Sequence, residues 1–226
     1  MMKQTYIIAE AGVNHNGSVE TAKKLITEAK RVGADAIKFQ TFKANDLILQ
    51  DTEKAKYQRD QTNESQFSML KRLELEQKDF KELLLFSHKK NIDFLSSAFD
   101  MESLNFLISL DLPKYKIPSG ELTTKPFLKK LGSINKPLIL STGMCSIEEI
   151  SLSLETLYDS GLDKKNLTLL HCNTDYPTAF SDVHLRAMEN LRDLFKVPVG
   201  YSDHTVGNEI SLGAVALGAC VIEKHF

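Results

Sequence analysis

Two histidines each close a short apolar run near the end of the sequence. The segments GYSDH and IEKH end at His204 and His225, and an alanine-rich stretch between them is long enough for one helix. This spacing is typical of a strand, a crossover helix and a second parallel strand. Because side chains alternate along a strand, Ser202 shares a face with His204 and Glu223 shares one with His225. Two imidazoles at the carboxyl ends of adjacent strands can converge on a divalent metal ion, although a strand-end histidine can also serve structure through a hydrogen bond.

Other polar residues follow the remaining β-rich runs. Lys38 and Lys116, among several hydroxyl groups, suit a small, multiply charged anion such as a phosphate or a carboxylate. Alternatively, Lys116 can form a Schiff base with a carbonyl substrate, as lysine aldolases do. The strand-end residues are Glu10, Lys38, Gln40, Lys116, Ser119, Glu121, Ser141, Thr174, Tyr176, Ser202, His204 and His225.

Two glutamates extend this picture. Glu10 ends the first β-rich run and should lie beside His225 if the strands close into a barrel. There it can orient a metal-bound water, accept a proton or pair with Lys38. Glu223 lies one layer deeper than His225, which favours an ion pair inside the barrel over a catalytic role.

Further candidates are weaker. His15 lies in a loop, and His171 beside Cys172 resembles half of a metal site, but no partner at ligand spacing accompanies the pair. Cys145, Cys172 and Cys220 are far apart and form no Cys-x-x-Cys motif. We expect all three to be reduced thiols.

The elements that must position these groups alternate regularly. Capping signals or helical periodicity separate most of the β-rich runs, including a Ser18 cap, an Asp100 cap and a Ser-x-x-Glu capping box at Ser146. Eight strands with intervening helices predict a (β/α)8 TIM barrel with its active site at the carboxyl ends of the strands. An open doubly wound sheet is the alternative, but its glycine fingerprint after the first strand is missing. The expected strands are 5–10, 34–40, 93–97, 112–118, 137–141, 167–171, 198–202 and a run ending at 225, and the expected helices include 19–32, 65–75, 78–90, 183–195 and one between 205 and 220.

Composition limits the class of protein. The 226 residues carry a formal charge of -2, which gives no global attraction to nucleic acid or to an anionic membrane. No apolar run approaches the roughly 20 residues that span a bilayer, so we expect a cytoplasmic protein. The long polar stretch 41–63 is expected to be a substrate lid.

Seven ordered motifs resemble those of the sialic acid synthases. The resemblance implies a (β/α)8 barrel that condenses phosphoenolpyruvate with an open-chain N-acylmannosamine, using a divalent metal, commonly Mn²⁺, with Mg²⁺ or Co²⁺ as alternatives. The motifs are AEAGVNHNG from Ala9, IKFQTFK from Ile37, YKIPSGE from Tyr115, LSTGM from Leu140, LHCNTDYP from Leu170, GYSDH from Gly200 and IEKHF from Ile222.

The same resemblance implies roles for individual residues. His204 and His225 would hold the metal, and Glu10 would lie near the reacting carbons. Tyr176 and Glu121 would contact the sugar. The family's asparagine of the second lid loop falls near Thr62 or Asn63, and Asn63 is the residue chosen here. Gln40, at a strand end, is placed in the same substrate site. The residues implied to hold phosphoenolpyruvate are Lys38, Lys116, Ser119, Ser141, Thr174 and Ser202, with Thr174 standing where many members have asparagine.

The sequence also departs from the family pattern. Members continue beyond this length with a Gly-Pro-Asp loop, a last barrel helix and a small antifreeze-protein-like domain that supplies an arginine to a partner subunit. We therefore expect residues 1–226 to form a truncated barrel domain that turns over poorly alone, with a homodimer expected at full length. The expected activity is N-acetylneuraminate synthesis from N-acetylmannosamine. The alternatives are legionaminic acid synthesis from 2,4-diacetamido-2,4,6-trideoxymannose, which resemblance favours over pseudaminic acid synthesis, or a catalytically impaired fragment or binding module.

Overall fold

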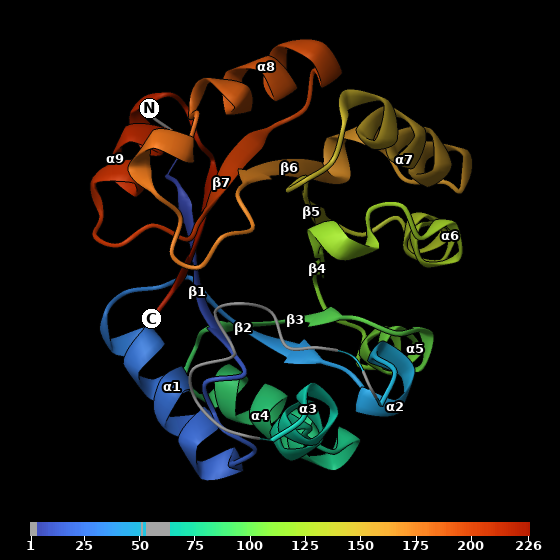
Figure 1. The fold of residues 1–226 in the computed structure, drawn as a ribbon, viewed down its shortest axis with the longest axis vertical. Coiled ribbons are helices and arrows are strands. Elements are labelled where there is room, and N and C mark those ends of the chain that lie inside the picture. Colours follow the sequence, from blue (N-terminus) through green and yellow to red (C-terminus); the bar gives the residue numbers. More distant parts are fainter. Residues whose placement is uncertain (1–3, 51, 53–63) are drawn as a thin grey trace.

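Eight parallel strands close into a barrel in chain order (Figure 1). The computed structural model describes residues 4–50, 52 and 64–226. Each strand pairs with the next, and β8 pairs with β1. The predicted TIM barrel is therefore confirmed, and the open doubly wound sheet is excluded. The strands are β1 (Tyr6–Gly12), β2 (Ala36–Thr41), β3 (Asp93–Ala98), β4 (Tyr115–Ile117), β5 (Leu138–Ser141), β6 (Leu167–Cys172), β7 (Val199–Asp203) and β8 (Val221–His225).

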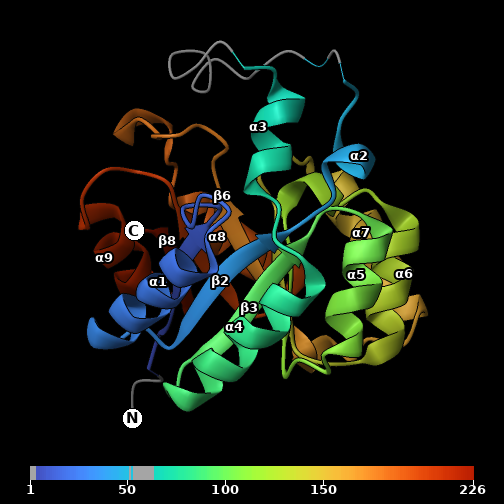
Figure 2. The same cartoon turned by 90° about the horizontal axis from the view of Figure 1, so that it is seen from below.

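Helices surround the barrel, as Figures 1 and 2 show. The predicted caps are present: Ser18 Oγ accepts from the Thr21 amide at 3.2 Å, and Ser146 forms a capping box with Glu149. These bonds satisfy amides that the first helical turn leaves without partners. The helices are α1 (Val19–Arg31), α2 (Ala44–Leu47), α3 (Gln66–Leu73), α4 (Gln77–Lys89), α5 (Met101–Ser109), α6 (Lys125–Ile134), α7 (Ile147–Asp159), α8 (Arg186–Phe195) and α9 (Glu209–Ala216).

Some predicted boundaries are wrong. The strand expected over 112–118 shortens to β4, because the prolines at 113 and 118 cannot donate to the ladder. The helix expected between 205 and 220 is only α9, which lies between Gly207 and Gly218, both at positive φ. The sequence patterns also miss α6, whose N-cap Thr124 makes no side-chain capping bond. Of the expected lid over 41–63, residues 41–50 and 52 are described and include α2, and the rest lies outside the described residues.

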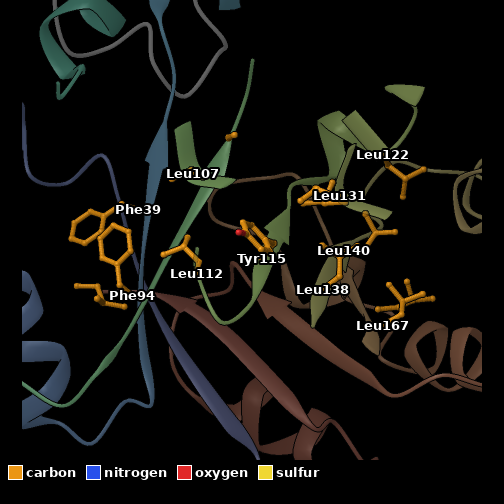
Figure 3. Close-up of a cluster of buried hydrophobic side chains, with 14 of the residues drawn as sticks. Phe39, Phe94, Leu107, Leu112, Tyr115, Leu122, Leu131, Leu138, Leu140 and Leu167 are labelled. Carbon is orange, nitrogen blue, oxygen red and sulfur yellow. The ribbon is translucent and has the colours of Figure 1, made fainter. Parts of the chain in front are cut away.

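Apolar side chains fill two regions. The larger lies between the barrel and its helices and includes Phe39, Phe94 and Leu140 (Figure 3). Alternation places the smaller cluster inside the barrel, and we call it the interior plug. Gly200 belongs at this level because a Cβ there would lie 2.3 Å from the Val221 carbonyl oxygen. The interior plug consists of Ile8, Ala36, Leu95, Ile139, Leu170 and Val221.

The interior plug separates two polar groups inside the barrel. Lys114, just before β4, and Lys116 point the same way, as predicted, but they lie at opposite ends of the barrel. Lys114 Nζ lies 2.9 Å from Asp93 Oδ2 and 3.8 Å from the centre of the Tyr6 ring, at the amino end of the strands. Lys116 is buried at the carboxyl end, 2.7 Å from Ser141 Oγ. Of these two lysines, only Lys116 lines the cavity at the carboxyl end.

The cysteines and the helix lengths can be compared with the expectations from the sequence. The three cysteines are free, in agreement with the expectation of reduced thiols. Among the described residues, no helix has both the length and the apolar character that crossing a bilayer requires.

Candidate active site

A cavity of about 450 Å³ opens at the carboxyl ends of the strands. Eleven of the thirteen sequence-predicted site residues line it. Glu121 lies behind Ser119 in the 3-10 turn Ser119–Glu121 and is not among the lining residues, and Asn63 lies outside the described residues. The predicted residues that line the cavity are Glu10, Lys38, Gln40, Lys116, Ser119, Ser141, Thr174, Tyr176, Ser202, His204 and His225.

Two lysines and two glutamates form the charged floor of this cavity. Lys38 Nζ lies 3.0 Å from Glu10 Oε2 and 3.5 Å from Glu223 Oε2. Lys116 Nζ lies 3.7 Å from Glu223 Oε1. All four side chains are almost fully buried. Glu223 therefore joins the two lysines, which agrees with the predicted ion pair inside the barrel, and Glu10 pairs with Lys38 as expected.

Burial and mutual charge set the ionisation of the charged floor. Burial raises the pKa of Glu10 to about 7, with Lys38 opposing the rise and Glu223 adding to it. Burial alone would also raise the pKa of Glu223, but Lys116 and Lys38 lower it to about 2. Burial lowers the pKa of Lys116, whereas the two glutamates outweigh burial and raise the pKa of Lys38. The charged floor thus pairs one firmly ionised carboxylate with one carboxyl group that can exchange a proton near neutral pH.

Serine hydroxyl groups and the backbone of Gly143 lie next to the charged floor. Lys116 donates to Ser141 Oγ, and Ser202 Oγ donates to Glu223 Oε1 at 3.0 Å. Ser119 Oγ accepts from the Gly143 amide at 2.8 Å. A Cβ on Gly143 would come within 3.0 Å of three neighbouring side chains, so only glycine fits without displacement. Cationic and hydroxyl donors therefore converge as a compact anion requires.

The two histidines lie on adjacent strands at the rim, as predicted. Their ring centres are 5.4 Å apart, and Tyr176 packs against His204 at 4.2 Å and edge-on to His225 at 5.7 Å. His204 Nδ1 lies 2.6 Å from the Asn173 carbonyl oxygen, so this nitrogen carries the proton and Nε2 is left as an acceptor. The register pairs Glu10 with His225, which confirms their predicted proximity.

This arrangement fits a divalent metal ion. Burial lowers the pKa of His204, and burial together with His204 lowers that of His225 to about 4, so both rings are neutral at pH 7 as ligands must be. The hydrogen bond from His204 to a carbonyl oxygen is the usual support of a metal-binding imidazole. Within the described part of the chain, no group of three or more His, Cys, Asp or Glu side chains is arranged to hold a metal. Two imidazoles would therefore need water or substrate oxygens to complete the coordination.

The weaker candidates do not join this site as metal ligands. His171 points away from the cavity and donates from Nε2 to the Val183 carbonyl oxygen at 2.7 Å. Cys172 points inward and lines the cavity, so the two side chains lie on opposite faces of β6. His15 is buried in the loop after β1, where its Nδ1 accepts from the Gly17 amide.

Sequence reasoning missed the apolar part of the lining. Met69, Leu70 and Leu73 of α3 and Phe99, just after β3, line the cavity. The helical periodicity over 65–75 predicts α3, but an amphipathic helix normally turns its apolar face to the protein core. α3 begins 25 residues after the end of β2, and nothing in the sequence between them predicts that α3 lies at the mouth of the barrel.

These features define a (β/α)8 barrel of the enzyme class, with cationic and hydroxyl donors gathered in a cavity at the carboxyl ends of its strands. The NeuB family model matches residues 25–226, and the chain belongs to the NeuB family. It is 56% identical to the N,N'-diacetyllegionaminic acid synthase of Campylobacter jejuni, over 100% of this chain and 68% of that protein. It is 50% identical to the protein of the same name from Legionella pneumophila, over 98% of this chain and 63% of that one.

A solved structure shows the same fold. It is the N-acetylneuraminic acid (sialic acid) synthetase of Leptospira borgpetersenii in complex with citrate. It matches this chain with a TM-score of 0.86 and 35% identity, over 99% of this chain and 73% of that one. The chain thus spans about two thirds of the length of the relatives that it matches.

Proposed function

We propose that this barrel condenses phosphoenolpyruvate with an open-chain N-acyl amino sugar and releases phosphate. The observation that carries the proposal is the charged floor, where Lys38 and Lys116 converge with Ser141 and Ser202 at the carboxyl ends of the strands. The names of two relatives, an N,N'-diacetyllegionaminic acid synthase and an N-acetylneuraminic acid (sialic acid) synthetase, support it. Oligomeric state and location in the cell remain predictions.

In this proposal Lys38 and Lys116 hold the phosphate and carboxylate of phosphoenolpyruvate, with hydroxyl donors from Ser119, Ser141 and Ser202. Thr174 contributes a further hydroxyl at the rim. Tyr176 and Gln40 face the sugar from opposite sides of the cavity. Glu121 and Asn63, which the resemblance also implies, stay predictions: Glu121 is not among the lining residues, and Asn63 lies outside the described residues.

The reaction joins C3 of phosphoenolpyruvate to the aldehyde carbon of the sugar. The carbonyl π bond breaks, its oxygen takes up a proton, and C2 gains oxocarbenium character, which the surrounding anionic groups and the bound phosphate offset. Water then adds to C2 and loses its proton to Glu10, whose pKa of about 7 suits a base near neutral pH. The tetrahedral adduct then collapses to the ketone: its hydroxyl group loses a proton as the C2–O bond to phosphate breaks, and the departing phosphate takes up that proton.

His204 and His225 are the residues that would hold a divalent metal ion, with Mn²⁺ the first candidate. Such an ion, when bound, supplies Lewis-acid polarisation of a carbonyl oxygen. The protein's own contribution is to keep both rings neutral and oriented, through burial and through the bond to the Asn173 carbonyl oxygen.

The acceptor is proposed to be the diacetamido-trideoxy sugar of legionaminic acid synthesis. The two relatives that share 56% and 50% identity carry that activity in their names, whereas the synthetase named for N-acetylneuraminic acid shares 35%. N-acetylmannosamine, the expected acceptor from sequence, becomes the second candidate.

Phosphate release in a coupled assay tests the reaction. The wild-type chain, given phosphoenolpyruvate, Mn²⁺ and each sugar, should release one phosphate per acidic sugar formed. Lys116→Met should reduce kcat/KM by about 100-fold or more, since a charge-assisted bond is worth about 1.5–3 kcal/mol and is lost together with a counter-charge. Lys114→Met, on the same face of β4 at the amino end, is the matched control and should keep the wild-type kcat/KM.

Two outcomes would contradict the proposal. The first is full activity in Lys116→Met. The second is a covalent adduct at Lys116 when the chain is treated with pyruvate and borohydride, which would favour the lysine aldolase alternative.

A further inference from the structure

The cavity has one wall of different chemistry from its floor. Met69, Leu70 and Leu73 face it from α3, and Phe99 adds an aromatic side chain. Figure 2 shows α3 standing beyond the carboxyl ends of the strands, where it borders the mouth of the barrel. We call these four residues the apolar wall.

Contacts at both ends of α3 hold the helix in this position. Glu74 Oε1 accepts from the Ala44 amide at 2.6 Å, which ties the end of α3 to the start of α2. The loop after β1 also packs closely against it, because a Cβ on Gly17 would lie 2.4 Å from the Arg72 carbonyl oxygen. Ser65 caps the amino end by accepting from the Ser68 amide. The apolar wall is therefore preformed.

The amide of Gln40 also faces the cavity. Gln40 lies two residues beyond Lys38 on β2, on the same face, and lines the cavity above the charged floor. Its side chain offers one acceptor and two donor hydrogens. An amide beside aliphatic side chains matches an acylamino group, which presents an N–H, a carbonyl oxygen and a methyl group.

The position of the reaction fixes which end of the acceptor meets this wall. The aldehyde carbon must reach phosphoenolpyruvate at the charged floor, so the remote carbons of the open chain extend toward the mouth. A hydroxyl group against aliphatic carbon gives up hydrogen bonds to water without replacement, which costs free energy. A methyl group in the same place is stabilised by leaving water.

We infer that the apolar wall and Gln40 form a subsite for acylamino and methyl substituents at the end of the acceptor remote from its aldehyde. The inference rests on the proposed function and deepens it by assigning acceptor specificity to named residues. Met69 and Leu70 are the specificity-determining positions that can be altered without disturbing the core, since both are partly exposed while Leu73 is buried.

The test compares two acceptors on the purified chain with phosphoenolpyruvate and Mn²⁺. These are 2,4-diacetamido-2,4,6-trideoxymannose and N-acetylmannosamine, and the measured quantity is the ratio of their kcat/KM values. We expect the wild type to favour the first by about 10–200-fold, the range that a methyl-sized difference in an apolar pocket produces. Met69→Gln and Leu70→Asn keep side-chain size but add an amide, and each should lower the ratio by about tenfold.

The matched control lies on the same helix. Lys71 is 52% exposed and does not line the cavity, so Lys71→Gln should keep the wild-type ratio. Thermal melting of all variants checks that α3 remains folded. An unchanged ratio in Met69→Gln and Leu70→Asn, with unchanged melting temperature, would overturn the subsite.

Failure of the reaction itself gives a separate result. If neither sugar releases phosphate, the proposed function is contradicted, and the subsite is then tested by titrating both sugars into the chain in a calorimeter. Tighter binding of the diacetamido sugar that weakens about tenfold in Leu70→Asn supports the subsite without turnover. Equal binding of both sugars to the wild type contradicts it.

Discussion

Glu10→Gln tests the ionisation of the charged floor most directly. The Glu10 side chain is 2% exposed and lies 3.0 Å from Lys38 Nζ. Burial raises its pKa from 4.5 to about 7, despite the opposing charge of Lys38. Glutamine has nearly the same shape but cannot ionise, so the substitution removes the titration while preserving the packing.

The size of the effect follows from the two pKa values. A carboxyl group with a raised pKa in the folded state contributes stability that is fully present below pH 4.5 and is lost as the pH rises through 7. The difference between 4.5 and about 7 corresponds to about 3 kcal/mol. Relative to the wild type, the unfolding free energy of Glu10→Gln should therefore rise by about 3 kcal/mol between pH 4.5 and pH 8. Phosphate release should fall in the same variant.

Urea unfolding in EDTA at pH 5, 6, 7 and 8 measures this difference without bound metal. Glu223→Gln is the matched control, because the pKa of Glu223 is lowered to about 2 and its contribution is lost only as the pH falls below 4.5. That variant should be less stable than the wild type throughout the range. Because Glu223 adds to the raised pKa of Glu10, the variant's stability relative to the wild type should rise with pH less than that of Glu10→Gln. Parallel stability curves for the wild type and Glu10→Gln would refute the reasoning.

Three further substitutions test separate parts of the structure. His204→Ala should weaken Mn²⁺ binding about 100-fold or more in calorimetry, whereas His171→Ala, whose ring points outward, should not; equal affinities would refute the ligand assignment. Gly143→Ala should lower the free energy of unfolding by about 1–3 kcal/mol and raise KM for phosphoenolpyruvate, because the new Cβ would come within 3.0 Å of three side chains; wild-type values in both would contradict the close fit. Tyr6→Phe should cost about 1 kcal/mol by removing the bond to Asp93 while leaving kcat/KM unchanged, and a loss of activity would contradict the separation of the two barrel ends.

The sequence predicts the polar part of the site well because these residues lie on or next to strands, where alternation decides which side chains share a face. Side chains alternate strictly along a strand, so positions 202 and 204, like 223 and 225, had to share a face. Barrel closure then places β8 beside β1, which predicts the register that joins Glu10 to His225. Local pattern and topology together suffice for these contacts.

Two features lay beyond such reasoning. The apolar wall depends on where α3 is placed by contacts such as Glu74 with the Ala44 amide, and no short-range pattern encodes that placement. The position of a residue along the barrel axis is equally hard to predict from sequence. Lys114 and Lys116 share a face, but only the stagger of neighbouring strands shows that the interior plug separates them.

The pairing of β1 with β8 joins segments more than 200 residues apart in the chain. Such distant contacts form late in folding and are costly in chain entropy. The charged floor and the histidine pair draw on both strands, so a molecule bound in the cavity contacts both sides of this junction. Occupancy should therefore slow hydrogen exchange of the β1 and β8 amides.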